Sequence, residues 1–204
     1  MKKMLYLVIS VIGNALGTAF MSETRLGMTA WGCGVKNFAH YFNLSIGVGF
    51  IVLSVFFYIA ANIIRKKIDI IEMVQSFLFL FTFGFLTDLF ILLMPNLNEL
   101  NFGLRLILNV VGLLILLFSI ALHLRVYIAV HPMDVFLRVI QEKMRSIAKG
   151  TYLVYFIAFS IAIIFGSLNR EIVGIGIGTI NTLILSGVIM NYFDSKVVMR
   201  WFIK

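Results

Sequence analysis

Six long apolar runs are the feature that most constrains what this chain can fold into. They extend over Met4–Met21, Ser45–Ile64, Ile70–Met94, Phe102–Val130, Thr151–Leu168 and Ile172–Phe193. Each is close to the roughly 20 apolar residues that a helix needs to cross a bilayer. Backbone polar groups have no water to bind within lipid, and a helix satisfies them internally. The runs therefore predict an all-α membrane protein with about six transmembrane helices.

The composition excludes an ordinary soluble domain. Apolar residues fill 61% of the 204 positions and charged residues only 13%, which leaves too little polar surface to face water. The formal net charge is +8, but the basic residues lie at the ends of the apolar runs, so we expect them to set topology and expect no nucleic-acid partner. The first run follows Met1-Lys2-Lys3 and no small-residue cleavage site comes after it, so we expect a retained span that contacts lipid.

The distribution of Lys and Arg predicts the orientation of the spans. If the N-terminus lies inside, thirteen of the 17 Lys and Arg residues fall on the inner side of the membrane. The remaining four, Arg25, Lys36, Arg105 and Arg170, fall on the outer side. Basic residues concentrate in cytoplasmic loops. We therefore expect both termini to be cytoplasmic.

Two amphipathic segments interrupt the apolar runs. Apolar residues recur at helical spacing in Met28–Asn43 and again in Pro132–Lys149, and each segment follows the first span of its half of the chain. The segments can lie at the membrane interface or enter the membrane as re-entrant helices, which requires that protein enclose them.

The order of elements in residues 1–97 recurs in residues 98–204. A shift of 103 residues places Gly47 on Gly150 and Asp88 on Asn191. Three spans per half make the two halves run in opposite directions across the bilayer. We therefore expect one membrane domain built from two inverted repeats.

Short motifs in three of these regions resemble those of a known family. The first is Gly27-Met28-Thr29-Ala30-Trp31-Gly32, after the first span. The second is Gly84-Phe85-Leu86-Thr87-Asp88, in the third span, and the third is Gly176-Ile177-Gly178-Thr179, near the start of the last span. Over nearly its whole length the chain resembles the YczE/YyaS/YitT group of bacterial membrane proteins, and its YczE branch most closely. Ala30 and Gly32 stand where that family has Pro and Asp, and the second half supplies these as Pro132-Met133-Asp134. The resemblance implies the bacterial cytoplasmic membrane and implies no biochemical activity.

Polar and aromatic side chains within or beside the spans are candidates for binding a solute. They are Asp88, Asn191, Gln75, Thr179, Trp31, Asp134 and Arg105. A carboxylate at membrane depth, such as that of Asp88, needs a partner, a proton or water. It can bind a solute or proton, or it can hydrogen bond to a neighbouring helix. Arg105 is the nearest basic partner that we expect for Asp88, because it lies near the start of the next span.

The other candidates also have structural interpretations. Buried amides such as those of Asn191 and Gln75 often join helices. Trp31 is an expected interfacial anchor, and Asp134 is an expected first-turn residue of a helix. Alternating glycines at 174, 176 and 178 predict close helix packing or, alternatively, a discontinuous helix whose free N–H groups bind an anion.

No pattern of catalytic groups is present in the sequence. Cys33 is the single cysteine, and the three histidines do not have the spacing of metal ligands. We therefore expect no cofactor, no metal and no enzymatic activity. The sequence predicts instead a transporter or solute-binding permease for a small metabolite or ion that is uncharged, weakly charged or partly apolar. Two alternatives are a membrane subunit of a multi-component importer, which would bind a partner protein or ATPase through 132–149, and a non-transporting accessory or anchor protein.

Overall fold

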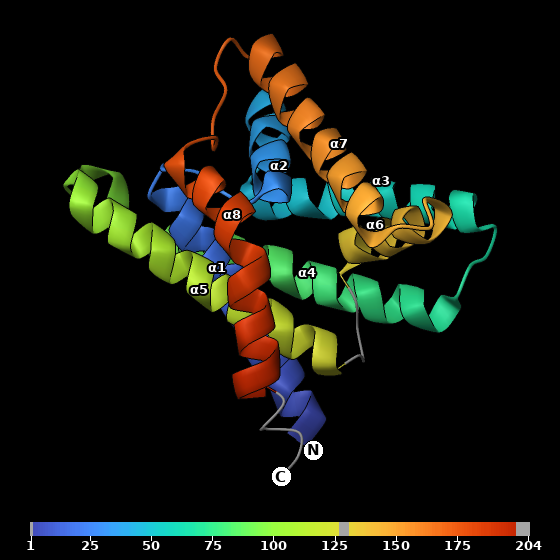
Figure 1. Ribbon diagram of the computed structural model, residues 1–204. Coiled ribbons are helices and arrows are strands. Elements are labelled where there is room, and N and C mark those ends of the chain that lie inside the picture. Colours follow the sequence, from blue (N-terminus) through green and yellow to red (C-terminus); the bar gives the residue numbers. More distant parts are fainter. Residues whose placement is uncertain (1, 127–130, 199–204) are drawn as a thin grey trace.

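The computed structural model describes residues 2–126 and 131–198, and the secondary structure of this part of the chain is entirely helical (Figure 1). The helices are α1 (Lys2–Glu23), α2 (Ala30–Tyr41), α3 (Ile46–Arg65), α4 (Ile70–Leu93), α5 (Phe102–Val126), α6 (Pro132–Lys143), α7 (Ile147–Leu168) and α8 (Ile177–Tyr192). A 3-10 turn, Leu97–Glu99, precedes α5, and a π-helical segment, Phe193–Val198, continues α8.

Five of these helices are long and apolar enough to cross a membrane. They are α1, α3, α4, α5 and α7. Their outer faces carry large apolar side chains, and Ile63, Leu92 and Phe156 are each at least 70% exposed, as lipid contact requires. Helix α8 is also apolar but has 16 residues, about 24 Å at 1.5 Å per residue. The chain is thus an all-α, multi-pass membrane protein, as the apolar runs predict.

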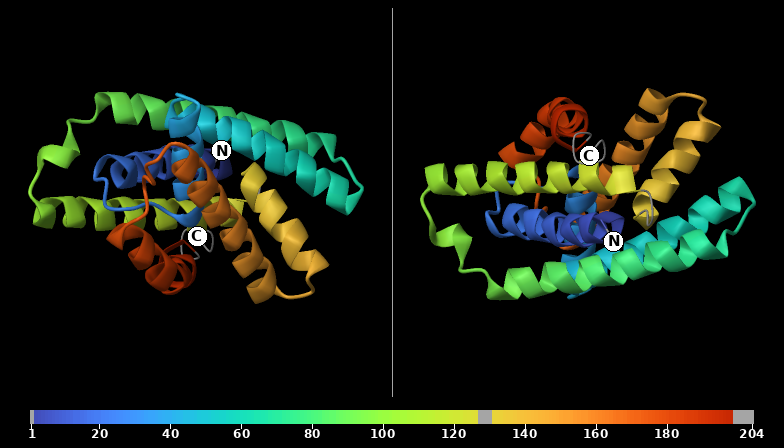
Figure 2. Two further views of the ribbon diagram at one scale, coloured as in Figure 1. Left: turned by 90° about the horizontal axis from the view of Figure 1, so that it is seen from above. Right: turned by 90° about the horizontal axis from the view of Figure 1, so that it is seen from below.

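Helix α1 lies at the centre of the molecule, between α4 and α5 (Figure 2). Small residues allow α1 and α5 to pack closely: a Cβ atom on Gly17 would lie 2.6 Å from the carbonyl oxygen of Gly112. A Cβ atom on Gly112 would lie 2.7 Å from the Cβ atom of Phe20. Close backbone approach at small residues is a common way for helices to associate in lipid. The first helices of the two halves therefore form the main contact between them.

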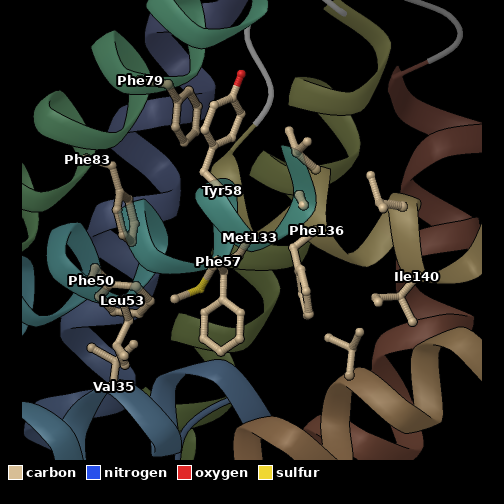
Figure 3. Close-up of a cluster of buried hydrophobic side chains, with 14 of the residues drawn as sticks. Val35, Phe50, Leu53, Phe57, Tyr58, Phe79, Phe83, Met133, Phe136 and Ile140 are labelled. Atoms are coloured by element: carbon tan, nitrogen blue, oxygen red, sulfur yellow. The ribbon is translucent and has the colours of Figure 1, made fainter. Parts of the chain in front are cut away.

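Contacts of α2 with α7, of α3 with α6 and of α4 with α6 also join the two halves, and most of the remaining contacts lie within a half. Helix α2 packs on α7 and on α3, and α6 packs on α3 and on α7. Helix α4 packs on α1, and α8 packs on α5. The start of α1 and the end of α8 lie at the same end of the molecule (Figure 1). The largest apolar core lies where α3, α4 and α6 meet, and it is drawn in Figure 3.

The expected amphipathic helix Pro132–Lys149 is wrong in its end point. Helix α6 stops at Lys143, because Arg145 adopts a left-handed conformation (φ 48°). Ser146 then caps the next helix by accepting a hydrogen bond from the backbone N–H of Lys149 at 3.3 Å. A side-chain cap of this kind satisfies one of the free N–H groups at a helix start. The last residues of the predicted segment therefore begin α7.

The sixth apolar run becomes helical only at Ile177, five residues after the expected start at Ile172. Gly174 has a φ of 77°, a conformation that glycine adopts without steric cost. Residues before Ile177 form a loop that hydrogen bonds to the segment between α1 and α2. The two segments together form a hydrogen-bonded junction.

Candidate functional site

Asp88 of α4 binds the N-terminus of α3. The hydroxyl of Ser45, the N-cap residue of α3, donates a hydrogen bond to one carboxylate oxygen. The backbone N–H of Gly47 donates to the other oxygen at 2.7 Å. The first N–H groups of a helix have no partners within the helix and carry partial positive charge. Asp88 therefore finds its compensating charge at a helix terminus.

Arg105 is not the partner of Asp88, contrary to our expectation. Its Nε donates a hydrogen bond to the carbonyl oxygen of Thr24, beyond the end of α1, at 2.9 Å. The expectation assumed that α4 and α5 are neighbours because a short loop joins them. Helix α1 lies between them instead (Figure 2), so the two side chains face different helices.

The loop before α2 and the loop before α8 hydrogen bond to each other. We call their residues, 24–29 and 173–179, the loop junction. The backbone N–H of Met28 donates to the carbonyl oxygen of Gly174 at 2.9 Å, and that of Gly178 donates to the carbonyl oxygen of Leu26 at 2.7 Å. Gly27 has a φ of 121° and a Cβ atom there would lie 2.6 Å from the backbone nitrogen of Thr179. The junction therefore needs a glycine at this position.

Side chains from α2 and α5 complete the hydrogen bonding of the loop junction. The Asn37 amide binds both backbone groups of Val173: its Nδ2 donates to the carbonyl oxygen at 2.6 Å, and its Oδ1 accepts from the N–H at 2.9 Å. Asn109 donates to Thr24 Oγ1 at 2.9 Å and to the Gly27 carbonyl oxygen at 3.0 Å. Each of these amides therefore pairs polar groups that the bundle would otherwise bury alone.

Two further side chains reach the carbonyl oxygen of Gly174. The Cys33 thiol donates to it at 3.0 Å and the Thr179 hydroxyl at 3.2 Å. Burial raises the pKa of the Cys33 thiol, so the sulfur keeps the proton that it donates. The loop junction is thus a densely bonded region that fixes the positions of α2, α5 and α8.

A second region, which we call the aromatic interior, lies between α3, α4 and α6 (Figure 3). Its rings are close: the centroids of Phe50 and Phe83 are 5.0 Å apart, and those of Phe57 and Phe136 are 4.9 Å apart. Two histidines border it. The His123 ring lies 4.5 Å from that of Phe79, and the His131 ring lies 5.5 Å from that of Phe83.

Buried polar atoms around the aromatic interior have no hydrogen-bond partner among the described residues. They are Ser54 Oγ, Ser76 Oγ, the Tyr58 hydroxyl, Trp31 Nε1 and both ring nitrogens of His123. Trp31 packs edge-on against Phe57, with ring centroids 4.9 Å apart. Ser54 and Ser76 lie one helical turn from Phe57 and Phe79. Most buried polar groups in proteins are paired. At the loop junction Asn109 Oδ1 is also without a partner in the described part of the chain, so the unpartnered atoms are concentrated around the aromatic interior but are not confined to it.

The first turn of α6 borders the aromatic interior. His131 caps this helix, since its Nδ1 accepts a hydrogen bond from the Met133 N–H at 3.3 Å. Burial, with a smaller effect of His123, lowers the pKa of His131 to about 3. Burial raises the pKa of Asp134 to about 6, although nearby Arg138 favours its ionised form. Burial therefore keeps His131 neutral at neutral pH, and it shifts Asp134 toward its neutral form without making that form dominant above pH 6.

The residues singled out from the sequence lie in different places. Thr179 and Arg105 both bind the loop junction, and Asp88 binds the start of α3. Trp31 borders the aromatic interior, and Asp134 lies in the first turn of α6.

Gln75 and Asn191 are the two remaining residues that were predicted to bind a solute. Gln75 is half-buried in α4, next to Ser76. The side chain of Asn191 lies outside the described residues. Ser54 and His123 were not predicted as binding residues, although each is a polar residue within an apolar run.

Comparison with known proteins identifies the family. Residues 1–195 match a family of unknown function, DUF6198. The uncharacterized protein YyaS of Bacillus subtilis (strain 168) is 27% identical over 204 residues, which cover 98% of this chain and 96% of that relative. The YyaS-like part of the resemblance is thus supported, and the closer likeness to YczE stays a prediction. No solved structure matches the chain. The chain, a multi-pass helical membrane protein, belongs to the DUF6198 family.

Proposed function

We propose that this protein binds a small, uncharged or weakly charged, partly apolar solute and carries it across the bacterial cytoplasmic membrane without catalysing a reaction. The observation that supports this proposal is the set of unpartnered polar atoms around the aromatic interior. Leaving a buried hydrogen-bonding group unpaired costs about 1–3 kcal/mol. A solute that hydrogen bonds to these groups and stacks on the rings would recover that cost.

The chemistry of the aromatic interior selects against charged solutes. The described ion pair, between Arg65 and Glu72 at 2.8 Å, lies at the end of α3. The His131 side chain, which borders the interior instead, is neutral because burial lowers its pKa to about 3. Moving a full charge into such a region costs several kcal/mol unless the charge is paired. A neutral solute with hydrogen-bonding groups avoids this cost.

Most helix contacts, although not that of α3 with α4, have a counterpart among the described residues when the two halves are exchanged, which favours an inverted repeat. Exchanging the halves turns α1 into α5, α2 into α6, α3 into α7 and α4 into α8. The contact of α2 with α7 then becomes the contact of α6 with α3, and the contact of α1 with α4 becomes that of α5 with α8; all four contacts are present. Residues with positive φ also pair across the halves, as Asn43 with Arg145 and Lys66 with Arg170. Inverted repeats are common among secondary transporters, which place their solute between the repeats.

A ligand screen tests this proposal. Purified protein in detergent is heated with members of a library of neutral and charged metabolites, and the melting temperature is recorded. We expect neutral, partly apolar compounds to raise it, because a ligand that binds only the folded state stabilises that state. Ser54→Ala and Ser76→Ala should abolish the ligand-induced increase while leaving the ligand-free melting temperature unchanged.

Ser160→Ala is the matched control, since its hydroxyl bonds to the carbonyl oxygen of Phe156 within α7 at 2.8 Å. This variant should keep the full response to the ligand. Uptake of a binding compound into proteoliposomes then distinguishes a carrier from a solute-binding subunit that needs partners. A ligand response that survives both Ser54→Ala and Ser76→Ala would rule out the aromatic interior as the site.

A further inference from the structure

A groove lies between α3 and α4 near the loop that joins them. Its volume is about 830 Å³. The side chains of Ile59, Ile63, Met73 and Phe77 form its apolar part, and those of Lys66 and Lys67 lie at one end. Ile59 and Ile63 are 54% and 70% exposed, so the groove opens toward the surface that faces lipid.

The two lysines at the end of the groove have no ion-pair partner among the described carboxylates. The nearby carboxylates are already engaged. Glu72 accepts from Arg65 at 2.8 Å, and Asp69 accepts from the backbone N–H of Glu72 at 3.0 Å and caps α4. Lys66 and Lys67 are both exposed, so their ammonium groups are accessible to a ligand.

The groove lies between the end of one candidate span, at Arg65, and the beginning of the next, at Ile70. This boundary between apolar helix and polar loop is the depth at which lipid headgroups lie, and basic residues here attract anionic lipids. A second copy of the chain is a poorer occupant. In a twofold dimer the same patch meets itself, which would bring the Lys66 and Lys67 side chains of both copies together.

We propose that this groove is a binding site for an anionic phospholipid. The phosphate binds the ammonium groups of Lys66 and Lys67, and one acyl chain lies along Ile59, Ile63 and Phe77. The site is independent of the aromatic interior and of the solute proposed above.

Native mass spectrometry and lipid titration of the purified full chain in detergent test the proposal, with dioleoyl phosphatidylglycerol compared against dioleoyl phosphatidylcholine. We expect tighter binding of the anionic lipid, and a loss of about fivefold for each lysine removed. The variants are Lys67→Gln and Lys66→Asn, because position 66 has a φ of 54° and Asn tolerates the left-handed conformation. Lys143→Gln, at the exposed end of α6, is the control and should bind as the unmodified chain does.

Three results would overturn the proposal. The first is an anionic-lipid preference that persists in the double variant of Lys66 and Lys67. The second is equally tight binding of glycerol phosphate, which would show that the apolar part of the groove does not contribute. The third is a dimer in light scattering that Ile63→Asp disrupts, which would assign the groove to a second copy of the chain.

Discussion

The loop junction and the aromatic interior are both buried and both contain polar side chains, but they treat these side chains differently. At the junction Asn37 binds both backbone groups of Val173, and Thr179 and Cys33 share the Gly174 carbonyl oxygen. In the interior, Ser54, Ser76 and His123 have buried atoms with no partner among the described residues. Paired groups hold a fold together, whereas unpaired ones offer hydrogen bonds to a ligand. The comparison therefore predicts which polar residues stabilise the fold and which are available to a ligand.

The largest expected effect is at the loop junction. Asn37→Ala should lower the free energy of unfolding by about 2–4 kcal/mol, because it leaves the N–H and carbonyl groups of Val173 without partners. Thermal unfolding in detergent, followed by circular dichroism, measures this loss. Asn98→Ala, at a half-buried position in the 3-10 turn, is the control. Equal stability of the two variants would contradict the structural role of the junction.

A pH effect is expected at the edge of the aromatic interior. Asp134 has a pKa of about 6 in the folded chain against an ordinary value of 3.8. Because the folded state binds the proton more tightly, protonated Asp134 stabilises the fold. This contribution to the free energy of unfolding is fully present below pH 4 and is lost as the pH rises through 6. Arg138 and Tyr155 are the charged and titratable groups that interact with it, and His131 lies one turn away.

The measurement is the difference in stability between the unmodified chain and Asp134→Asn, compared at pH 4 and pH 7. We expect the unmodified chain to lose about 2 kcal/mol relative to the variant over this range. Taking the difference removes the opposite effect of His131, whose low pKa favours folding at higher pH. A difference that does not change with pH would show that water reaches the Asp134 carboxylate.

A smaller effect is expected where α4 meets α3. Asp88→Asn should destabilise the fold by about 1 kcal/mol, because the amide keeps the shape of the carboxylate but loses its charge at the helix terminus. If Asp88 instead binds solute, the same variant should lose ligand binding at unchanged stability. Chemical denaturation together with the ligand screen distinguishes these results, and a variant that changes neither would exclude both roles.

The smallest effect sharpens the comparison most. Ser54→Ala should change stability by less than about 0.5 kcal/mol, because its hydroxyl makes no bond that the substitution would break. Ser45→Ala removes a helix cap and should cost about 1 kcal/mol, so it shows that the method can detect the loss of one serine hydroxyl in α3. A large loss in Ser54→Ala would mean that its hydroxyl has a structural partner and would weaken the case for a binding site.

Local patterns predicted the helices well and their neighbours poorly. Apolar periodicity anticipated α2 within two residues of each end, because a helix depends on its own sequence. The late start of α8 was not predictable in the same way, since Gly174 follows hydrogen bonds to a loop that is distant in sequence. The expected contact of Asp88 with Arg105 failed for a related reason. A short loop indicates proximity along the chain, and it could not show that α1 lies between α4 and α5.

The site was predictable only in part for a similar physical reason. A buried carboxylate such as Asp88 is conspicuous in an apolar run, and it was singled out. A serine such as Ser54 is not, because a helix can satisfy most serine hydroxyls from its own backbone carbonyls. Only the three-dimensional contacts show which serines remain without a partner.

The close contact of α1 with α5 also has a consequence for synthesis. Helix α1 leaves the ribosome first, and its glycine face at Gly17 must remain without its partner until Gly112 has been made and inserted. The first three long helices therefore enter the bilayer before the centre of the protein can form. The helices of this chain must therefore insert before they pack together, and the contact of α1 with α5 can form only after α5 has entered the membrane.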